Sequence, residues 1–239
     1  AHPLRRAARQ EPSPPTDRYA SIHQETTMNF STDRDLLLYE PTLFNDLPWV
    51  AQQRVSVTDG EVTGTALASA QADFEAAQVG AGSVLLVNKT PVEVLARIDA
   101  MTLTVSLPRA RTTDAAIPPG DVSSASVVAR AFAPQAELVC GSLLRMLGLD
   151  RDDPDRPLDA EAVVSLTLMA RLETLGTLER VYSSAAALTG DNDALLFKAA
   201  EYRRRLLDAA ARCPVRIDTT GDGLPDEKRY VGVGRLTRA

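Results

Sequence analysis

Residues 159–213 read DAEAVVSLTLMARLETLGTLERVYSSAAALTGDNDALLFKAAEYRRRLLDAAARC, and this stretch decides the helical part of the fold. Apolar residues recur in both halves at steps of three and four, the spacing that keeps side chains on one face of a helix. They are Val164, Leu168, Leu172, Leu175, Leu178 and Tyr182 in the first half, and Leu195, Ala199, Tyr202, Leu206, Ala209 and Cys213 in the second. The pattern predicts two long helices.

A short polar turn, Thr189 to Asp193, separates the two halves. Gly190 suits the position just after a helix, where the backbone often has a positive φ. Asp191 suits the N-cap of the next helix, because its carboxylate can accept hydrogen bonds from the unpaired N–H groups there. So short a connection forces the two helices to run antiparallel, as a helical hairpin.

Composition limits the classes of function. The chain has 239 residues, of which 44% are hydrophobic, so it can form one large domain or two small ones. Aromatic residues make up only 5% and the formal net charge is −6, and both values argue against a dedicated nucleic-acid-binding protein. No apolar run reaches the roughly 18 residues of a membrane-spanning helix, and the arginines near the N-terminus are not followed by the apolar segment of a secretory signal.

The histidine and cysteine content further limits the catalytic and metal-binding chemistry that we expect of the chain. The only histidines, His2 and His23, lie in a polar, proline-rich segment that we predict to be an extended arm over residues 1–34. The rest of the chain lacks the imidazole that Ser-His-Asp or Cys-His catalysis and most histidine metal sites require, so we do not expect an enzyme. Cys140 and Cys213 fall at apolar positions of predicted helices, and we expect reduced core thiols.

Residues 35–130 have the features of β structure. Asp46-Leu47-Pro48-Trp49 predicts a turn into a strand, and we expect Trp49 to be a packing anchor. Asp59-Gly60, between alternating residues on both sides, predicts a two-residue hairpin turn. Further short strands are predicted over residues 84–87, 92–98 and 103–107, followed by a linker over 109–123. Strands at this spacing are typical of a small barrel or sandwich.

The C-terminal half adds a third helix. Pro134 suits the first turn of that helix and Gly148 its end, while Asp159 suits the N-cap of the long helix that follows. We therefore predict an α+β fold, with a small β-barrel or sandwich-like domain over 35–130. A three-helix bundle built on the long helical hairpin follows over 131–213, and extended arms flank the two domains over 1–34 and 214–239.

The sharpest local motif is the acidic stretch Asp218-Thr219-Thr220-Gly221-Asp222-Gly223-Leu224-Pro225-Asp226. EF-hand loops place oxygen ligands at alternate positions around a central glycine. Here the ligands would be Asp218, Thr220, Asp222, the Leu224 carbonyl and Asp226, with Gly223 at the turn. Thr220 replaces an Asp or Asn, and Arg229 stands where the bidentate Glu belongs. A calcium site and a plain acidic turn both fit, and no other cofactor is predicted.

Two further segments are candidates for binding a partner. Arg203, Arg204 and Arg205 form the densest basic patch, which is either a solvated helix face, with Glu201 paired to Arg205, or a contact for phosphate or an acidic surface. Residues 229–239 contain glycines that would weaken a lone strand. We expect this tail to bind a partner through Tyr230, Val231, Val233, Arg235, Leu236 and Arg238.

Residues 185–238 resemble the C-terminal part of head–tail connector proteins of tailed bacteriophages and gene transfer agents. The matching features are Gly190-Asp191-Asn192-Asp193, Lys198 to Arg203 on the helix, Asp218 with Gly221-Asp222-Gly223, and a Gly-Arg-Leu-x-Arg ending over 234–238. Three segments of the β-rich part also look like small β-domains of phage structural proteins: Val62 to Thr65, Ala72 to Phe74 and Thr102 to Ser106. The β-rich part itself departs from the smallest adaptors of this class.

The resemblance implies a structural virion protein of the neck, made in the host cytoplasm, that forms a closed, dodecameric ring beneath the portal. The implied partners are the portal protein, neighbouring copies, and a downstream stopper or tail protein, with DNA passing through the lumen without sequence-specific contacts. Two other classes fit the residues. One is a calcium-binding extracellular or surface module, favoured by the acidic loop. The other is a small enzyme using carboxylates alone, which would need paired acids with raised pKa values in a cleft.

Overall fold

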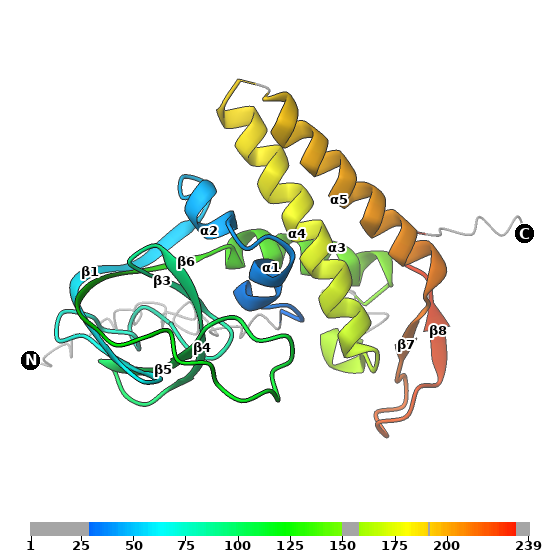
Figure 1. Ribbon diagram of the computed structural model, residues 1–239. Helices are drawn as coiled ribbons and strands as arrows, with labels where there is room; N and C mark the ends of the chain where they lie inside the picture. The colour runs from blue at the N-terminus through cyan, green and yellow to red at the C-terminus, as the bar shows by residue number, and fades with distance from the viewer. Residues whose placement is uncertain (1–28, 150–157, 191, 233–239) are drawn as a thin grey trace, which may run out of the picture.

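The computed structural model describes residues 29–149, 158–190 and 192–232 of the chain. It has an α+β fold, in which a closed antiparallel β-barrel lies beside a group of helices (Figure 1). The barrel consists of β1 (Gln52–Thr63), β2 (Ala66–Ala68), β3 (Val84–Val87), β4 (Thr90–Arg97), β5 (Thr102–Ser106) and β6 (Val122–Ala131), in the order β1-β2-β5-β4-β3-β6. Of the two architectures left open by the sequence, the barrel is the one that forms.

The barrel interior is filled by one apolar cluster that draws on all six strands and on the β2–β3 connection. Its fully buried members include Leu67, Phe74, Val79, Leu85, Val92, Leu103, Val105 and Val127. The inward positions alternate with outward ones along the regular parts of the strands, as the pleat of a strand requires, and the alternation shifts at the irregularities of the β1–β6 pairing. The turn at Asn88-Lys89 has positive φ at both residues, 48° and 69°, which matches the twist of the two strands that it connects.

The hairpin predicted at Asp59-Gly60 is wrong. Strand β1 continues through both residues to Thr63, and the chain turns at Gly64, where φ is +59°. Gly60 instead sits at an irregularity in the β1–β6 pairing, where a Cβ atom would lie 2.3 Å from Cγ2 of Val127. The glycine at this position therefore serves close packing inside the barrel rather than a turn.

Strand β6 was not anticipated as a strand. It pairs with β1 on one side and β3 on the other, and so closes the barrel. Its inward residues are mostly small, with Ala125, Ala129 and Ala131 joining Val127, and serines precede them. Such residues give a weak strand signal because the apolar surface that they bury is small.

Two short helices, α1 (Asp33–Tyr39) and α2 (Leu43–Asp46), precede the barrel in the chain but pack with the helices. Leu36, Leu37, Leu43 and Phe44 are fully buried in the helical core, so this part of the segment predicted as β-rich is helical. The side chain of Trp49 is 54% exposed, and its prediction as a packing anchor is wrong.

The C-terminal half contains α3 (Ala133–Met146), the 3₁₀ turn η1 (Ala160–Ala162), α4 (Leu166–Leu188) and α5 (Asp193–Arg212). The predicted hairpin is α4–α5, and Gly190 has the expected positive φ of 74°. The caps differ from those predicted. Asn192 caps α5 by accepting a hydrogen bond from the Ala194 N–H at 3.0 Å, whereas Asp191 lies outside the described residues. Asp159 caps η1 through the Glu161 N–H, and α4 begins later, at Leu166.

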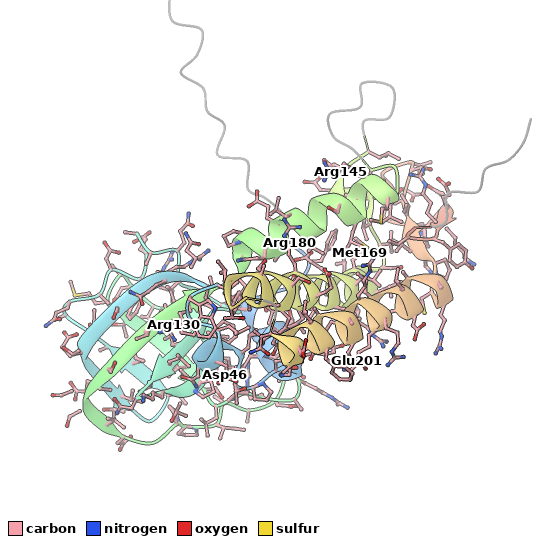
Figure 2. The ribbon with its side chains drawn as sticks, turned by 90° about the horizontal axis from the view of Figure 1, so that it is seen from above. Asp46, Arg130, Arg145, Met169, Arg180 and Glu201 are labelled. Carbon is pink, nitrogen blue, oxygen red and sulfur yellow. The ribbon has the colours of Figure 1, made fainter. Side chains whose placement is uncertain are left out.

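Helix α4 is the central helix of this half, with α3 on one side and α5 on the other (Figure 2). Every residue from Leu172 to Leu178 is buried, so α4 is covered nearly all round rather than along the single predicted face. Gly176 allows the closest approach, since a Cβ atom there would lie 2.6 Å from Cγ1 of Val139 on α3. Of the two cysteines, Cys140 is buried on α3 as expected, but Cys213 is exposed.

One strand links the barrel to the helices. All four residues of β3 are buried, because Leu85 and Val87 face the barrel interior while Val84 and Leu86 belong to the helical core. Phe132, between β6 and α3, lies in the same helical core, with its ring 5.2 Å from that of Phe44 in an edge-on arrangement. The two cores thus share a wall, which ties the positions of the barrel and helices to each other.

A small hairpin of β7 (Val215–Ile217) and β8 (Glu227–Arg229) follows α5. An isolated bridge between Val163 and Ile217 and the hydrogen bond from the Asp218 N–H to the Ala162 carbonyl attach it to the segment before α4. Beyond β8, Val231 is only 6% exposed and packs into the helical core. The arm predicted over 214–239 is therefore not extended in its first part, which forms this hairpin and contributes Val231 to the helical core.

Candidate functional site

The deepest polar cluster lies where α1 meets the barrel. Glu93 points outward from β4 but is fully buried, and its two carboxylate oxygens accept hydrogen bonds from Arg34 of α1 and Arg109 of the β5–β6 loop. The Arg109 Nε–Oε1 distance is 2.6 Å, and Arg34 also donates to the Arg109 carbonyl at 2.6 Å. A buried carboxylate between two guanidinium groups is an internal ion triad, and here it fixes α1 and the loop against the barrel.

A second buried carboxylate fixes the chain just before α1. Glu173 of α4 accepts hydrogen bonds from the Phe30 N–H at 2.9 Å and from the N–H and hydroxyl of Ser31 at 3.2 and 2.7 Å. Burial raises the pKa of Glu173, although these hydrogen bonds oppose the effect. The last residues of the predicted 1–34 arm are thus bound to α4, while residues 1–28 lie outside the described residues.

A third cluster joins the end of α1 to both helices of the hairpin. Glu40 accepts hydrogen bonds from Lys198 Nζ at 2.8 Å and from the Tyr202 hydroxyl at 2.6 Å. The rings of Tyr182 and Tyr202 stack 5.8 Å apart, and Lys198 also donates to the Tyr182 hydroxyl. Burial opposes ionisation of Glu40, but the hydrogen bonds from Lys198 and Tyr202 dominate and lower its pKa. All three clusters hold elements together, and none is an open catalytic cleft.

The predicted basic patch lies on the exposed face of α5. Glu201 pairs with Arg205 at 2.8 Å, as the spacing predicts, and also with Arg204 at 2.8 Å. Arg205 lies over the ring of Tyr202. Arg203 is exposed and makes no side-chain hydrogen bond or ion pair within the described residues. Of the three arginines, Arg203 is therefore the one most available to a partner.

A groove of about 390 Å³ lies between the first half of α4 and the second half of α5. Its sides carry Leu168, Arg171 and Leu175 from α4, and Asp208, Ala209 and Arg212 from α5; Tyr39, Arg205 and Cys213 complete the rim. Neither Arg171 nor Arg212 has a side-chain hydrogen bond or ion pair to any other part of the described chain. The groove therefore combines an apolar floor with two unpaired guanidinium groups, and we call it the α4–α5 groove.

The predicted acidic motif forms the loop between β7 and β8, residues 218–226, which we call the β7–β8 loop. Asp218 accepts backbone hydrogen bonds from Thr220, Gly221 and Gly223 at 3.0, 2.7 and 2.6 Å. Asp226 accepts from the N–H groups of Thr219 and Thr220 at 3.0 and 3.2 Å. Although desolvation acts in the opposite direction on Asp218, these donors lower the pKa of both carboxyl groups. The loop is thus ordered by its own backbone, and Asp222 is exposed beside Leu224.

The sequence leaves open whether the β7–β8 loop binds calcium or is a plain acidic turn, and a melting experiment distinguishes the two. Within residues 29–149, 158–190 and 192–232, no group of three or more His, Cys, Asp or Glu side chains is placed to hold a metal ion. We expect the backbone hydrogen bonds to hold the loop, so a chelator should leave the melting temperature unchanged. If calcium raises the melting temperature and Asp222→Ala removes the rise, the loop binds the ion, because a ligand bound only to the native state stabilises it.

Three large apolar side chains are exposed on the helical turns next to the polar tip of the α4–α5 hairpin. Leu188 at the end of α4 and Leu196 and Phe197 at the start of α5 are exposed, with Phe197 at 74%. The tip projects beyond the barrel and the other helices (Figure 1). A cluster of exposed large apolar side chains on a projecting element is typical of a protein-binding surface.

The predicted tail residues divide into three groups. Tyr230 is partly exposed and stays a candidate for partner binding, whereas burial in the helical core removes Val231 from that role. Val233, Arg235, Leu236 and Arg238 lie outside the described residues. Arg229 donates to the Leu147 carbonyl at the end of α3 and to the Glu227 carboxylate, both at 2.6 Å.

Sequence reasoning missed the α4–α5 groove and the three buried clusters. A signal existed for Glu93, since a lone carboxylate between Val92 and Val94 in a predicted strand requires a partner if it is buried. No comparable signal marked the groove, because Tyr39, Arg171 and Arg212 come from three separate helical segments. Residues far apart in sequence that form a surface together leave no local pattern.

Comparison of the chain with models of protein families, with curated proteins and with solved structures finds no match. In the part of the chain that the structure describes, no helix is both long and apolar enough to span a membrane.

Proposed function

We propose that this protein is a structural adaptor of a phage-type particle, which forms a ring beneath the portal and links the capsid to the tail. The helices α3, α4 and α5 act in it as one helical adaptor unit, and the barrel is carried beside them. Its partners are the portal protein, neighbouring copies and a downstream stopper or tail protein, in the virion neck.

The projecting hairpin tip is the observation that carries the proposal. Exposed Leu188, Leu196 and Phe197 provide apolar surface near the tip of the long α4–α5 hairpin. Burying large apolar side chains of this kind contributes about 1.5–3 kcal/mol each, so the tip has the chemistry of a protein contact. An adaptor needs such contacts on surfaces that point away from its own core.

The rigid connection between barrel and helices supports the same role. The Arg34–Glu93–Arg109 triad, the Glu173 anchor and the shared strand β3 all join elements that a linker would leave independent. A protein that holds two assemblies in a fixed relative position benefits from a rigid connection of this kind. Little conformational entropy is then lost when it binds them.

The test is attachment to the portal protein proposed as its partner. Co-sedimentation and negative-stain imaging should show a ring on the portal, and Phe197→Asp should abolish it by placing a charge in the apolar contact. Ile98→Asp is the matched control, since Ile98 is 65% exposed on the barrel and should tolerate the same change. The melting temperature of both variants should equal that of the unmodified protein.

Three other outcomes would revise this proposal. If Phe197→Asp attaches fully, the hairpin tip is not the contact and the tail is the next candidate. Deletion of 233–239, beyond the buried Val231, then tests the tail directly. If attachment also survives that deletion, Arg203→Glu tests the basic face of α5. No ring on the portal with the unmodified protein contradicts the adaptor function itself.

A further inference from the structure

The β7–β8 loop and the α4–α5 groove have complementary chemistry. Leu224 at the loop is 65% exposed and is flanked by the exposed acids Asp222 and Asp226, whereas the neighbouring Glu227 is paired with Arg229 at 2.6 Å. The groove has an apolar floor of Leu168, Leu175 and Ala209, with Arg171 and Arg212 at its sides. An apolar knob flanked by carboxylates therefore exists on the same chain as an apolar groove with two unpaired guanidinium groups; the other charged residues of the groove, Asp208 and Arg205, pair with Arg204 and Glu201.

The loop is built as a fixed knob. The Asp218 and Asp226 carboxylates hold it from within through backbone hydrogen bonds as short as 2.6 Å. The Leu224 N–H is itself bonded to Asp222 at 2.8 Å. Because the loop is ordered before any contact, docking it costs little conformational entropy.

The loop does not fill the groove of its own chain. The β7–β8 hairpin continues beyond the C-terminal end of α5, and its loop is directed away from the two long helices (Figure 1). The bridge between Val163 and Ile217 holds the hairpin to the segment before α4. The occupant that fits the groove is therefore the loop of another copy.

We propose that neighbouring copies of this protein associate head to tail, with the β7–β8 loop of one copy in the α4–α5 groove of the next. Leu224 enters between Leu168 and Leu175, and Oδ2 of Asp222 and Oδ1 of Asp226, which the internal hydrogen bonds of the loop leave unused, pair with Arg171 and Arg212 through charge-assisted hydrogen bonds. The two contacting surfaces differ, so the contact is heterologous, and repeating it generates a ring when the rotation closes. The inference deepens the proposed ring and rests on the adaptor function for its setting.

The test uses a thiol that the protein already carries at the groove. Cys213 is exposed on the groove rim, whereas Cys140 is buried on α3 and burial raises its pKa to about 12, so it stays unreactive. Leu224→Cys in the full chain, oxidised with copper phenanthroline at high protein concentration, should give a ladder of disulfide-linked trimers and larger species. Leu224→Cys combined with Cys213→Ser should lose the ladder.

Two controls test whether the disulfides form through the proposed contact rather than through random collision of exposed thiols. Ile98→Cys places a thiol at a site equally exposed, at 65%, on the barrel and should give no ladder. Arg171→Glu in the Leu224→Cys background should lose the ladder through charge repulsion. For the protein with Leu224 intact, sedimentation velocity should show self-association that Leu224→Asp removes.

Three results would overturn the contact. A product that stops at the dimer indicates a two-fold contact, and an intrachain disulfide without larger species shows that the loop reaches its own groove. Absence of both the ladder and the self-association also rejects it. The portal is absent from these experiments, so the two proposals fail separately: a ladder without portal attachment contradicts the adaptor function, and attachment without a ladder contradicts only this contact.

Discussion

Glu93→Gln should lower the free energy of unfolding by about 3–5 kcal/mol, which is the usual cost of removing one partner from a buried ion pair. The substitution keeps the shape of the side chain but removes the negative charge between Arg34 and Arg109, which are only 7% and 8% exposed. Two guanidinium groups would then share a low-dielectric site, with the Asp35 carboxylate, 3.9 Å from Arg34, as the remaining counter-ion. Urea unfolding followed by circular dichroism measures the change.

The matched control is Glu75→Gln. Glu75 also pairs with an arginine, Arg97, but at 3.9 Å and with its side chain 70% exposed. Exposed pairs contribute about 0–1 kcal/mol, so the unfolding midpoint should hardly move. Equal effects of the two substitutions would show that the Glu93 triad does not hold α1 to the barrel.

Phe132→Ala should cost about 3–5 kcal/mol of stability, as is typical for a fully buried aromatic residue. Phe132 lies between the last barrel strand and α3, packs edge-on against Phe44, and belongs to the core shared with β3. The cavity would open at the junction of barrel and helices, so both parts should unfold at the same lowered urea concentration.

Phe197→Ala is the matched control, because it makes the same substitution at a highly exposed position. Its side chain is 74% exposed at the hairpin tip, so stability should change by no more than about 0.5 kcal/mol. A small effect of Phe132→Ala, similar to that of Phe197→Ala, would mean that the junction is not a tightly packed core. Separate unfolding of barrel and helices would contradict the shared wall.

The local sequence determined the helical hairpin and several strands. Spacing of three and four fixed α4 and α5, and Gly190 ended α4 because glycine adopts a positive φ without steric cost. The turn at Asn88-Lys89 and the acidic β7–β8 loop also follow from residues close in the chain. These features share one cause, namely that their hydrogen bonds and side-chain contacts lie within a few residues.

Tertiary contacts decided the remainder. Gly60 is part of a continuous strand, rather than a turn, because β6 lies alongside and Val127 takes the space of a Cβ atom. Alanines of β6 become core residues only once the barrel closes around them, and Val231 becomes one only because the helices offer a site. The α4–α5 groove likewise needs Tyr39, Arg171 and Arg212 to be brought together from separate elements. Burial of small residues and convergence of distant charges are properties of the packed chain, so periodicity and turn residues cannot encode them locally.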